Sequence, residues 1–126
     1  MKPALRRAVF ALLALPLLAC ESPTAAREAD RLTVESVEVR IMESLPVQVS
    51  ASVRGYLRDG CETLGATTQS RSGSTITVAI ATDRETDRSC IQVISPVQQD
   101  VRLEGDFSAG TYLLRVNGLE RTFRVD

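Results

Sequence analysis

GTYLLRVNGLERTFRV, residues 110–125, is the stretch of sequence that decides the fold class. Apolar side chains share one parity on each side of Asn117-Gly118, namely Tyr112, Leu114 and Val116, then Leu119, Phe123 and Val125. A period of two is that of a half-buried β-strand. Asn-Gly tolerates the positive φ angles of a two-residue type I′ turn. The stretch therefore predicts a β-hairpin in which Val116 pairs with Leu119.

The same period continues from this hairpin back to Leu32. Its inward positions are Val37, Val39 and Ile41; Val47, Val49, Ala51, Val53, Gly55 and Leu57; Ile76, Val78 and Ile80; and Val97, Val101 and Leu103. Turn residues interrupt these runs at Ser44-Leu45-Pro46, Arg58-Asp59-Gly60 and Ser70-Arg71-Ser72-Gly73. Leu32 and Val34 have the opposite parity from Val37, which predicts a bulge near residues 35–36. About seven short strands with turns every 8–12 residues predict a β-sandwich, with a partly open or up-and-down barrel as the alternative.

One segment narrows the fold further. The pattern Leu103-x-x-x-Phe107-x-x-Gly110-x-Tyr112-x-Leu114-x-Val116 resembles the stretch leading into strand F of immunoglobulin-like domains. There, a Gly two residues before a Tyr introduces the tyrosine corner, whose hydroxyl bonds to upstream backbone. Leu114 stands where antibody domains have Cys, and the chain has no Trp. The resemblance therefore implies an all-β, antiparallel sandwich of the immunoglobulin-like or fibronectin type rather than an antibody domain.

The N-terminal residues predict an export signal. Lys2, Arg6 and Arg7 precede an apolar run from residue 8 to 18, which is too short for a membrane-spanning helix and matches a signal peptide. The run ends in Leu17-Leu18-Ala19-Cys20, which resembles the lipobox of bacterial lipoproteins. The resemblance implies a signal peptide over residues 1–19 and lipidation of Cys20. The alternative is an ordinary signal peptide cleaved near Ala25-Ala26, with Cys20 discarded.

Cleavage before Cys20 leaves a polar tether over residues 20–31 and a domain over residues 32–126. Several acyl chains would hold this domain at the membrane of the cell envelope. Glu21, rather than Asp, follows Cys20, and the lipoprotein resemblance then favours the outer membrane if the envelope is Gram-negative. Loss of three of the 15 basic residues leaves 12 against 16 acidic ones, a net charge of −4. That charge excludes the basic footprint of a nucleic-acid-binding protein.

Two cysteines remain after lipidation, Cys61 and Cys90. An even pair in an oxidising compartment predicts a disulfide. Neither cysteine belongs to a Cys-x-x-Cys motif, and the chain has no His that could activate a thiol. We therefore expect a structural bridge that joins two loops or strand ends.

No motif in the chain carries catalytic chemistry. The absence of His removes the commonest general base and metal ligand. Asp83, Glu85 and Asp87 alternate, but a calcium loop starting at Asp83 would need Gly at position 88 and Glu at 94, where the chain has Arg88 and Ile94. We expect a solvated charged turn there, and no catalytic residue, metal or cofactor in the domain.

One segment could form a contact surface. Tyr56 has the outward parity of its strand and lies between Arg54 and Arg58. Tyr and Arg are enriched at interfaces. The sequence thus predicts a non-catalytic, lipid-anchored envelope module that binds a protein or glycan partner, with its oligomeric state left open. The chain is also similar to small uncharacterised bacterial lipoproteins.

Two other functions stay open. The first is a secreted cysteine-protease inhibitor, similar to the chagasin-like family, in which three loops at one end of an immunoglobulin-like sandwich plug an active-site cleft. The Asn-Pro-Thr-Thr-Gly-like loop of that family does not occur in this chain. The second is an enzyme whose acidic residues converge only in the folded state.

Overall fold

The computed structural model describes residues 31–126. The predicted signal peptide, Cys20 and all of the tether before Arg31 lie outside the described residues. Seven strands make up the domain: β1 (Thr33–Met42), β2 (Gln48–Leu57), β3 (Glu62–Ser72), β4 (Thr75–Arg84), β5 (Ser95–Arg102), β6 (Gly110–Val116) and β7 (Leu119–Val125). None of residues 31–126 belongs to a helix long and apolar enough to span a membrane.

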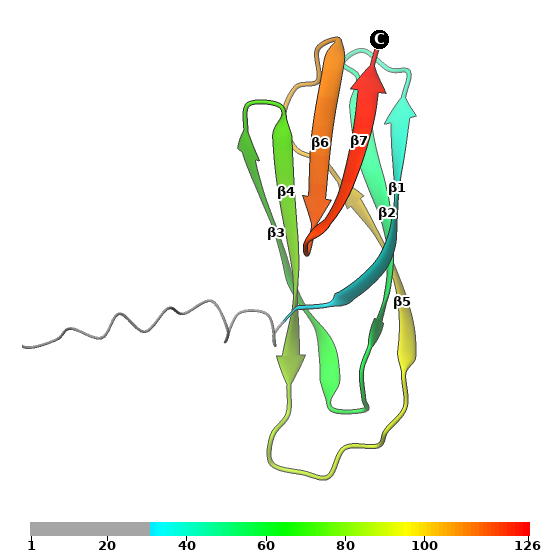
Figure 1. Cartoon of the computed structure of the whole chain (residues 1–126), viewed down its shortest axis with the longest axis vertical. Coiled ribbons are helices and arrows are strands. Elements are labelled where there is room, and N and C mark those ends of the chain that lie inside the picture. Colours follow the sequence, from blue (N-terminus) through cyan, green and yellow to red (C-terminus); the bar gives the residue numbers. More distant parts are fainter. Residues whose placement is uncertain (1–30) are drawn as a thin grey trace, which may run out of the picture.

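The strands form two sheets, as predicted for a β-sandwich. One sheet has the order β1-β2-β5, and the other has the order β3-β4-β6-β7 (Figure 1). The core between them consists of the predicted inward side chains of both sheets, with Val49, Ala51, Val53, Ile80, Leu114 and Val116 fully buried. Burial of these alternating positions is what holds the two sheets together.

One pairing departs from the antiparallel rule. β4 and β6 run parallel, with Thr75 opposite Leu113 and Val78 opposite Val116, whereas the other paired strands are antiparallel. Parallel neighbours need a long crossover connection. Residues 85–109 supply it, because they carry the chain through β5 in the opposite sheet before it returns as β6.

The Asn117-Gly118 hairpin is confirmed. The two residues have φ angles of 47° and 91°, and Val116 pairs with Leu119. The Asn117 side chain has a second role, because its Nδ2 donates to the carbonyl oxygens of Leu32 at 2.8 Å and Ile80 at 2.9 Å. The turn thereby fixes the start of β1 against β4.

The bulge at the start of β1 is also confirmed. The register with β2 shifts between Val34 and Ser36. This shift explains how Leu32 and Val37, which have opposite parities, are both buried in the core.

The tyrosine corner is present at Tyr112. Its hydroxyl donates to the carbonyl oxygen of Ser108 at 2.7 Å. The ring lies 5.3 Å from the rings of Phe107 and Phe123, and the guanidinium of Arg71 covers the Phe107 ring at 4.9 Å. The immunoglobulin-like resemblance therefore holds at the residues that carried it.

Two local expectations were wrong. Ile41 was expected to point into the core but is 40% exposed, because it is the last but one residue of β1, an edge strand. Residues 70–72 were expected to form a turn but belong to β3, whose Ser72 pairs with Thr75. The turn itself consists only of Gly73 and Ser74, and Gly73 has a φ of 58°.

The β6–β7 hairpin is shorter than the sandwich and covers only part of its length. The turn lies near the middle of the molecule in Figure 1, and β2, β3, β4 and β5 continue past it to the lower end. That lower end carries the β2–β3 turn, residues 58–61, and the β4–β5 loop, residues 85–94. We call residues 58–62 and 84–94 together the disulfide end.

Candidate functional site at the disulfide end

A disulfide joins the two connections of this end. Cys61 in the β2–β3 turn is bonded to Cys90 in the β4–β5 loop, with their Cα atoms 5.3 Å apart. The even number of cysteines left after lipidation predicted this bond. Two backbone hydrogen bonds reinforce the bridge: Gly60 N donates to the oxygen of Ile91 at 2.8 Å, and Glu85 N donates to the oxygen of Cys61 at 3.1 Å. The loop is thus held against the turn at three places.

The buried carboxylate of Asp59 organises the turn. It accepts a hydrogen bond from Cys61 N at 2.9 Å and is paired with the Arg84 guanidinium at the end of β4. The hydrogen bond from Arg84 is the largest influence on this carboxyl group. It holds the pKa of Asp59 below the usual value of an aspartate despite the opposing effect of burial.

Glu62 provides a second buried charge at the start of β3. Its carboxylate accepts hydrogen bonds from Arg58 Nη2 at 3.0 Å, from Arg58 N at 2.6 Å and from Thr82 Oγ1 at 3.0 Å. Burial is the largest single influence and acts to raise the pKa of Glu62. The hydrogen bonds from Arg58 and Thr82 together outweigh it, so the pKa lies below its usual value.

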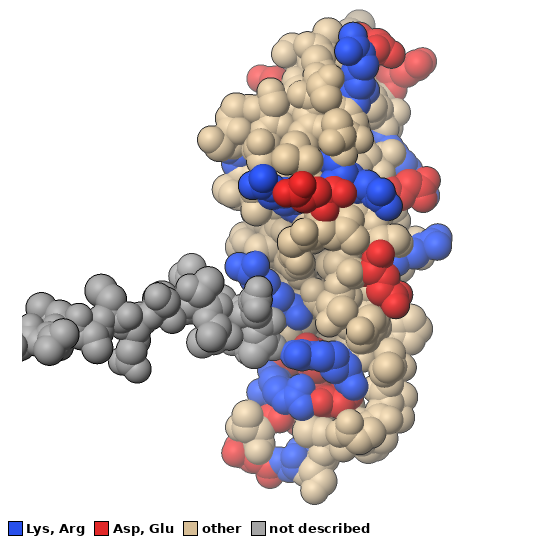
Figure 2. All heavy atoms as spheres, viewed as in Figure 1, with Lys and Arg blue, Asp and Glu red and all other residues tan. Residues whose placement is uncertain are grey.

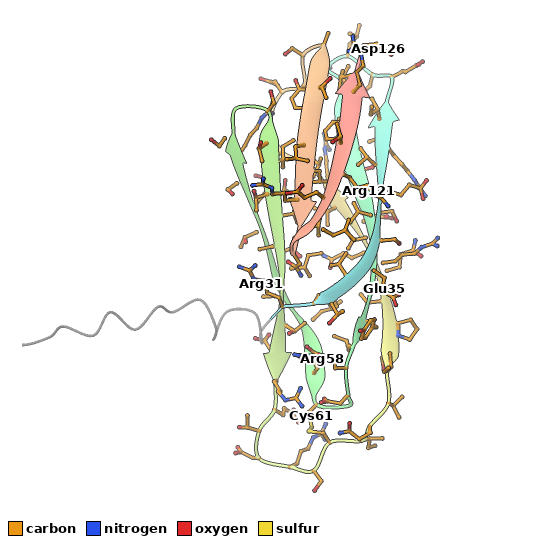
Figure 3. The ribbon with its side chains drawn as sticks, viewed as in Figure 1. Arg31, Glu35, Arg58, Cys61, Arg121 and Asp126 are labelled. Carbon is orange, nitrogen blue, oxygen red and sulfur yellow. A yellow bond between two sulfur atoms is a disulfide. The ribbon has the colours of Figure 1, made fainter. Side chains whose placement is uncertain are left out.

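We call the Cys61–Cys90 bridge and the Asp59–Arg84 and Arg58–Glu62 pairs together the brace. Figure 3 shows Arg58 and Cys61 close together at this end, and Figure 2 shows basic and acidic groups interleaved there. Breaking a buried ion pair is far more costly than breaking one at the surface, because it leaves an unpaired charge out of water. The charge pairs therefore hold the β2–β3 turn against the end of β4, and the disulfide holds Cys90 of the β4–β5 loop against the same turn.

The braced loop displays aliphatic side chains to solvent. Ile91 is 72% exposed, Val93 52% and Ile94 64%, and we call residues 91–94 the aliphatic loop. Leu64 on the neighbouring β3 is 43% exposed. A second exposed group, which includes Leu45, lies around the β1–β2 turn at the opposite end of the sandwich.

A charged hollow adjoins the aliphatic loop. Residues 84–88 line an open hollow of about 550 Å³. Asp83, Glu85 and Asp87 are exposed, as expected for a solvated charged turn, and Glu85 pairs with Arg88 at 2.8 Å. The acidic side chains of this segment thus face water.

The predicted contact residues separate into two groups. Arg54 and Tyr56 lie on the outer face of β2, opposite Gln98 and Pro96 of β5, and Tyr56 is half-buried. Arg58 lies beyond the end of β2 and holds Glu62. The structure therefore brings Arg54 and Tyr56 together, whereas Arg58 belongs to the brace.

Three residues at the disulfide end have the side-chain types and spacing of metal ligands. Asp59, Cys61 and Cys90 place their ligand atoms within 4.8 Å of one another. The two sulfur atoms are bonded to each other, so neither is a thiolate ligand. The third group, Asp59, is neutralised by Arg84.

Comparison with known proteins places the fold in a family. Residues 51–125 match the family model described as the ORF11 beta-sandwich domain. The chain belongs to the ORF11 beta-sandwich domain family. The matched stretch of this ORF11 beta-sandwich domain contains the whole disulfide end, so the brace and the aliphatic loop lie inside the family region.

Relatives of this ORF11 beta-sandwich domain occur in Herpetosiphon aurantiacus. The "Uncharacterized 10.2 kDa protein in HgiCIIM 5'region" is 35% identical over 94 residues, which is 75% of this chain and all of the relative. The "Uncharacterized 10.2 kDa protein in HgiBIM 5'region" is 30% identical over 82 residues, which is 65% of this chain and all of that relative. No solved structure matches the chain.

Proposed function

We propose that this ORF11 beta-sandwich domain is a non-catalytic binding module, lipid-anchored at the bacterial cell envelope through Cys20, that contacts a protein partner with its disulfide end. The observation that carries the proposal is the aliphatic loop, in which three large apolar side chains are more than half exposed on a braced segment. Exposed apolar side chains gathered at one place mark interaction sites more often than scattered ones do.

Bracing lowers the cost of binding through such a loop. A flexible loop loses conformational entropy when it docks, whereas a loop already held in one shape loses less. The Cys61–Cys90 bridge and the Asp59–Arg84 pair supply this preorganisation. Burial of the three side chains would then contribute about 25 cal/mol for each Å² removed from water.

The side-chain chemistry favours a protein over a glycan. The exposed groups of the loop are the branched aliphatic chains of Ile91, Val93 and Ile94, which fit an apolar groove. Three of the aromatic rings that could stack on a sugar, those of Phe107, Tyr112 and Phe123, are buried in the core.

Export and anchoring rest on separate support. The lipobox-like residues end at Cys20, and a disulfide between Cys61 and Cys90 suits an oxidising compartment. The tether before Arg31 would leave the domain near the membrane surface.

The protease-inhibitor alternative would use the end of the sandwich opposite the disulfide. An inhibitory edge of that kind uses three loops at one end of the sandwich. At the disulfide end the described chain offers the β2–β3 turn and the β4–β5 loop, whereas the β1–β2, β3–β4 and β5–β6 connections lie toward the opposite end (Figure 1). Titration of a papain-like protease with the domain tests this alternative. Inhibition at micromolar concentrations of the domain would favour it over the partner-binding proposal.

Site-specific photo-crosslinking in intact cells tests the proposed contact. A photoreactive residue replaces Val93 in the full chain, and the matched control replaces Leu45, an exposed apolar residue at the opposite end. We expect a discrete crosslinked species from position 93 that disappears when Ile91 and Ile94 are both changed to Asp. Absence of a species at position 93, or the same species at both positions, would contradict the proposed contact.

A further inference from the structure

The outer edge of β3 differs from the other three sheet edges of the molecule. β1 and β5 are the outer strands of one sheet, and β3 and β7 are the outer strands of the other. An outer strand presents unpaired backbone N–H and C=O groups, which native proteins usually protect with charges, proline or a covering side chain.

The β5 edge has two such protections. Pro96 lies near its start and cannot donate a hydrogen bond to another strand. The Gln69 side chain covers its other end, because Nε2 donates to Arg102 O at 2.7 Å while Oε1 accepts from Glu104 N at 3.1 Å.

The β1 and β7 edges are protected by charge and by a covering arginine. Arg121 of β7 donates from Nε to the carbonyl oxygen of Val37 in β1 at 3.1 Å (Figure 3). Glu120 and Arg124 add exposed charges to β7, and Glu38 adds one to β1. A strand that approached either edge would have to displace or bury these groups.

Within the described domain, the β3 edge lacks charge, proline and a covering side chain, and a register shift between Leu64 and Thr67 leaves it regularly paired with β4 from Thr67 onward. Residues 63–70, with the sequence TLGATTQS, contain no charged residue and no proline, and we call them the β3 edge. The flanking charges point elsewhere, because Glu62 is buried against Arg58 and Arg71 covers the Phe107 ring. Among residues 31–126, no capping hydrogen bond like that of Gln69 or Arg121 reaches the backbone of this edge.

We propose that the β3 edge pairs antiparallel with the β3 edge of a second copy of this chain. Two-fold pairing brings the same neutral stretch against itself, so no like charges meet. The exposed Thr68 would lie at the centre of the joined edges, and cross-strand Thr pairs are favourable. The result is one continuous sheet of two four-stranded halves.

The surface beside the edge favours a second copy over an extended peptide. A peptide that adds to an edge is selected by pockets for its alternate side chains. The outward positions of the adjacent β4 are small residues, namely Thr75, Thr77, Ala79 and Ala81. Such a surface gives little side-chain selectivity, whereas homotypic pairing needs only the backbone and a neutral edge.

Co-purification of two differently tagged full-length copies from the same cells tests this pairing. We expect wild-type copies to be recovered together. Thr68→Lys in both copies places like charges in the joined edges and should lower joint recovery by roughly tenfold or more. Combining one Thr68→Lys copy with one Thr68→Glu copy should restore it, because the charges then attract.

The control adds the same charge to an already protected edge. Thr122 is an exposed residue of β7, and Thr122→Lys should leave joint recovery unchanged. If Thr68→Lys lowers the melting temperature of the domain, Ser70→Lys at another exposed position of the β3 edge repeats the test. Failure of wild-type copies to associate, or failure of the Lys–Glu combination to restore association, would overturn the proposal. The pairing does not require lipid, so the Cys20→Ser chain should give the same pattern whether or not the anchor exists.

Discussion

Replacing Arg58 by Met removes the guanidinium that faces the buried carboxylate of Glu62. The aliphatic part of the side chain is kept, so the main loss is the charged partner. Glu62 is 3% exposed and would keep its hydrogen bonds from Arg58 N at 2.6 Å and Thr82 Oγ1 at 3.0 Å.

The structure sets the size of the effect. Removing one partner of a fully buried ion pair costs about 3–5 kcal/mol of stability. The cost is smaller here, because the Arg58 side chain is 43% exposed and two other donors remain on the carboxylate. We expect a loss of about 2 kcal/mol in the free energy of unfolding at pH 7, which lowers the melting temperature of a domain of this size by roughly 10 °C.

The effect depends on pH with a definite sign. In the wild type the pKa of Glu62 is lowered, so the carboxylate stabilises the fold above its unfolded pKa of about 4.3, and this is lost as pH falls through the folded pKa. Arg58→Met removes the side-chain hydrogen bond and the charge of Arg58, both of which lower the pKa of Glu62, so this pKa rises relative to the wild type. The variant therefore gains less stability than the wild type from the ionised Glu62 at neutral pH. The stability difference between wild type and variant should therefore be largest at pH 7 and should shrink below about pH 4.

Chemical denaturation of both proteins at pH 7 and at pH 3 measures this difference. Arg115→Met is the matched control, because Arg115 and Glu120 form a pair at 2.8 Å in which both side chains are about half exposed. Such a surface pair contributes less than about 1 kcal/mol. A difference for Arg58→Met that stays equal at the two pH values, or that is no larger than the control, would refute the role assigned to Glu62.

Three further predictions concern single features. Cys20→Ser should abolish lipidation, and the intact mass of the mature protein shows whether the wild type carries acyl groups; a wild type without them would contradict the anchor. Gly118→Val should lower stability by about 1–3 kcal/mol, because a β-branched residue is strained at a φ of 91°; an unchanged melting temperature would contradict this. Changing Cys61 and Cys90 to Ala should cost about 3 kcal/mol, since the bridge joins residues 29 apart in sequence; an unaltered unfolding curve would show that the bridge adds no stability.

Local sequence features were sufficient for much of the fold. Alternation of apolar residues located the strands other than β3, whose sequence has no such alternation, Asn117-Gly118 located the last turn, and the Gly110-x-Tyr112 pattern located the tyrosine corner. Each of these depends on a few neighbouring residues and on backbone geometry, which the local sequence determines.

The strand neighbours could not be read in the same way. The alternation in β4 and β6 is equally compatible with a parallel and an antiparallel pairing, because it records which face is buried and not which strand lies alongside. The parallel pairing follows from the path of residues 85–109 through the opposite sheet.

The candidate site was predicted only in part. The disulfide followed from the cysteine count, but Arg58 was taken as a contact residue and Glu62 was not singled out. The signal for the brace is weak, because two acids on either side of Cys61 are common in exposed turns. Their burial is visible only once β4 brings Thr82 and Arg84 beside them.

The length of the β6–β7 hairpin links the fold to the site. Because the chain turns back at Asn117-Gly118, no part of β6 or β7 covers the lower part of β2, β3, β4 and β5 (Figure 1). Apolar packing is therefore scarce there, and three of the four buried polar residues of the described domain, Asp59, Glu62 and Thr82, lie in this region. A disulfide and two charge pairs hold this end together in place of a core. Ile91, Val93 and Ile94 are exposed at this same end, on the loop that the disulfide joins to the β2–β3 turn.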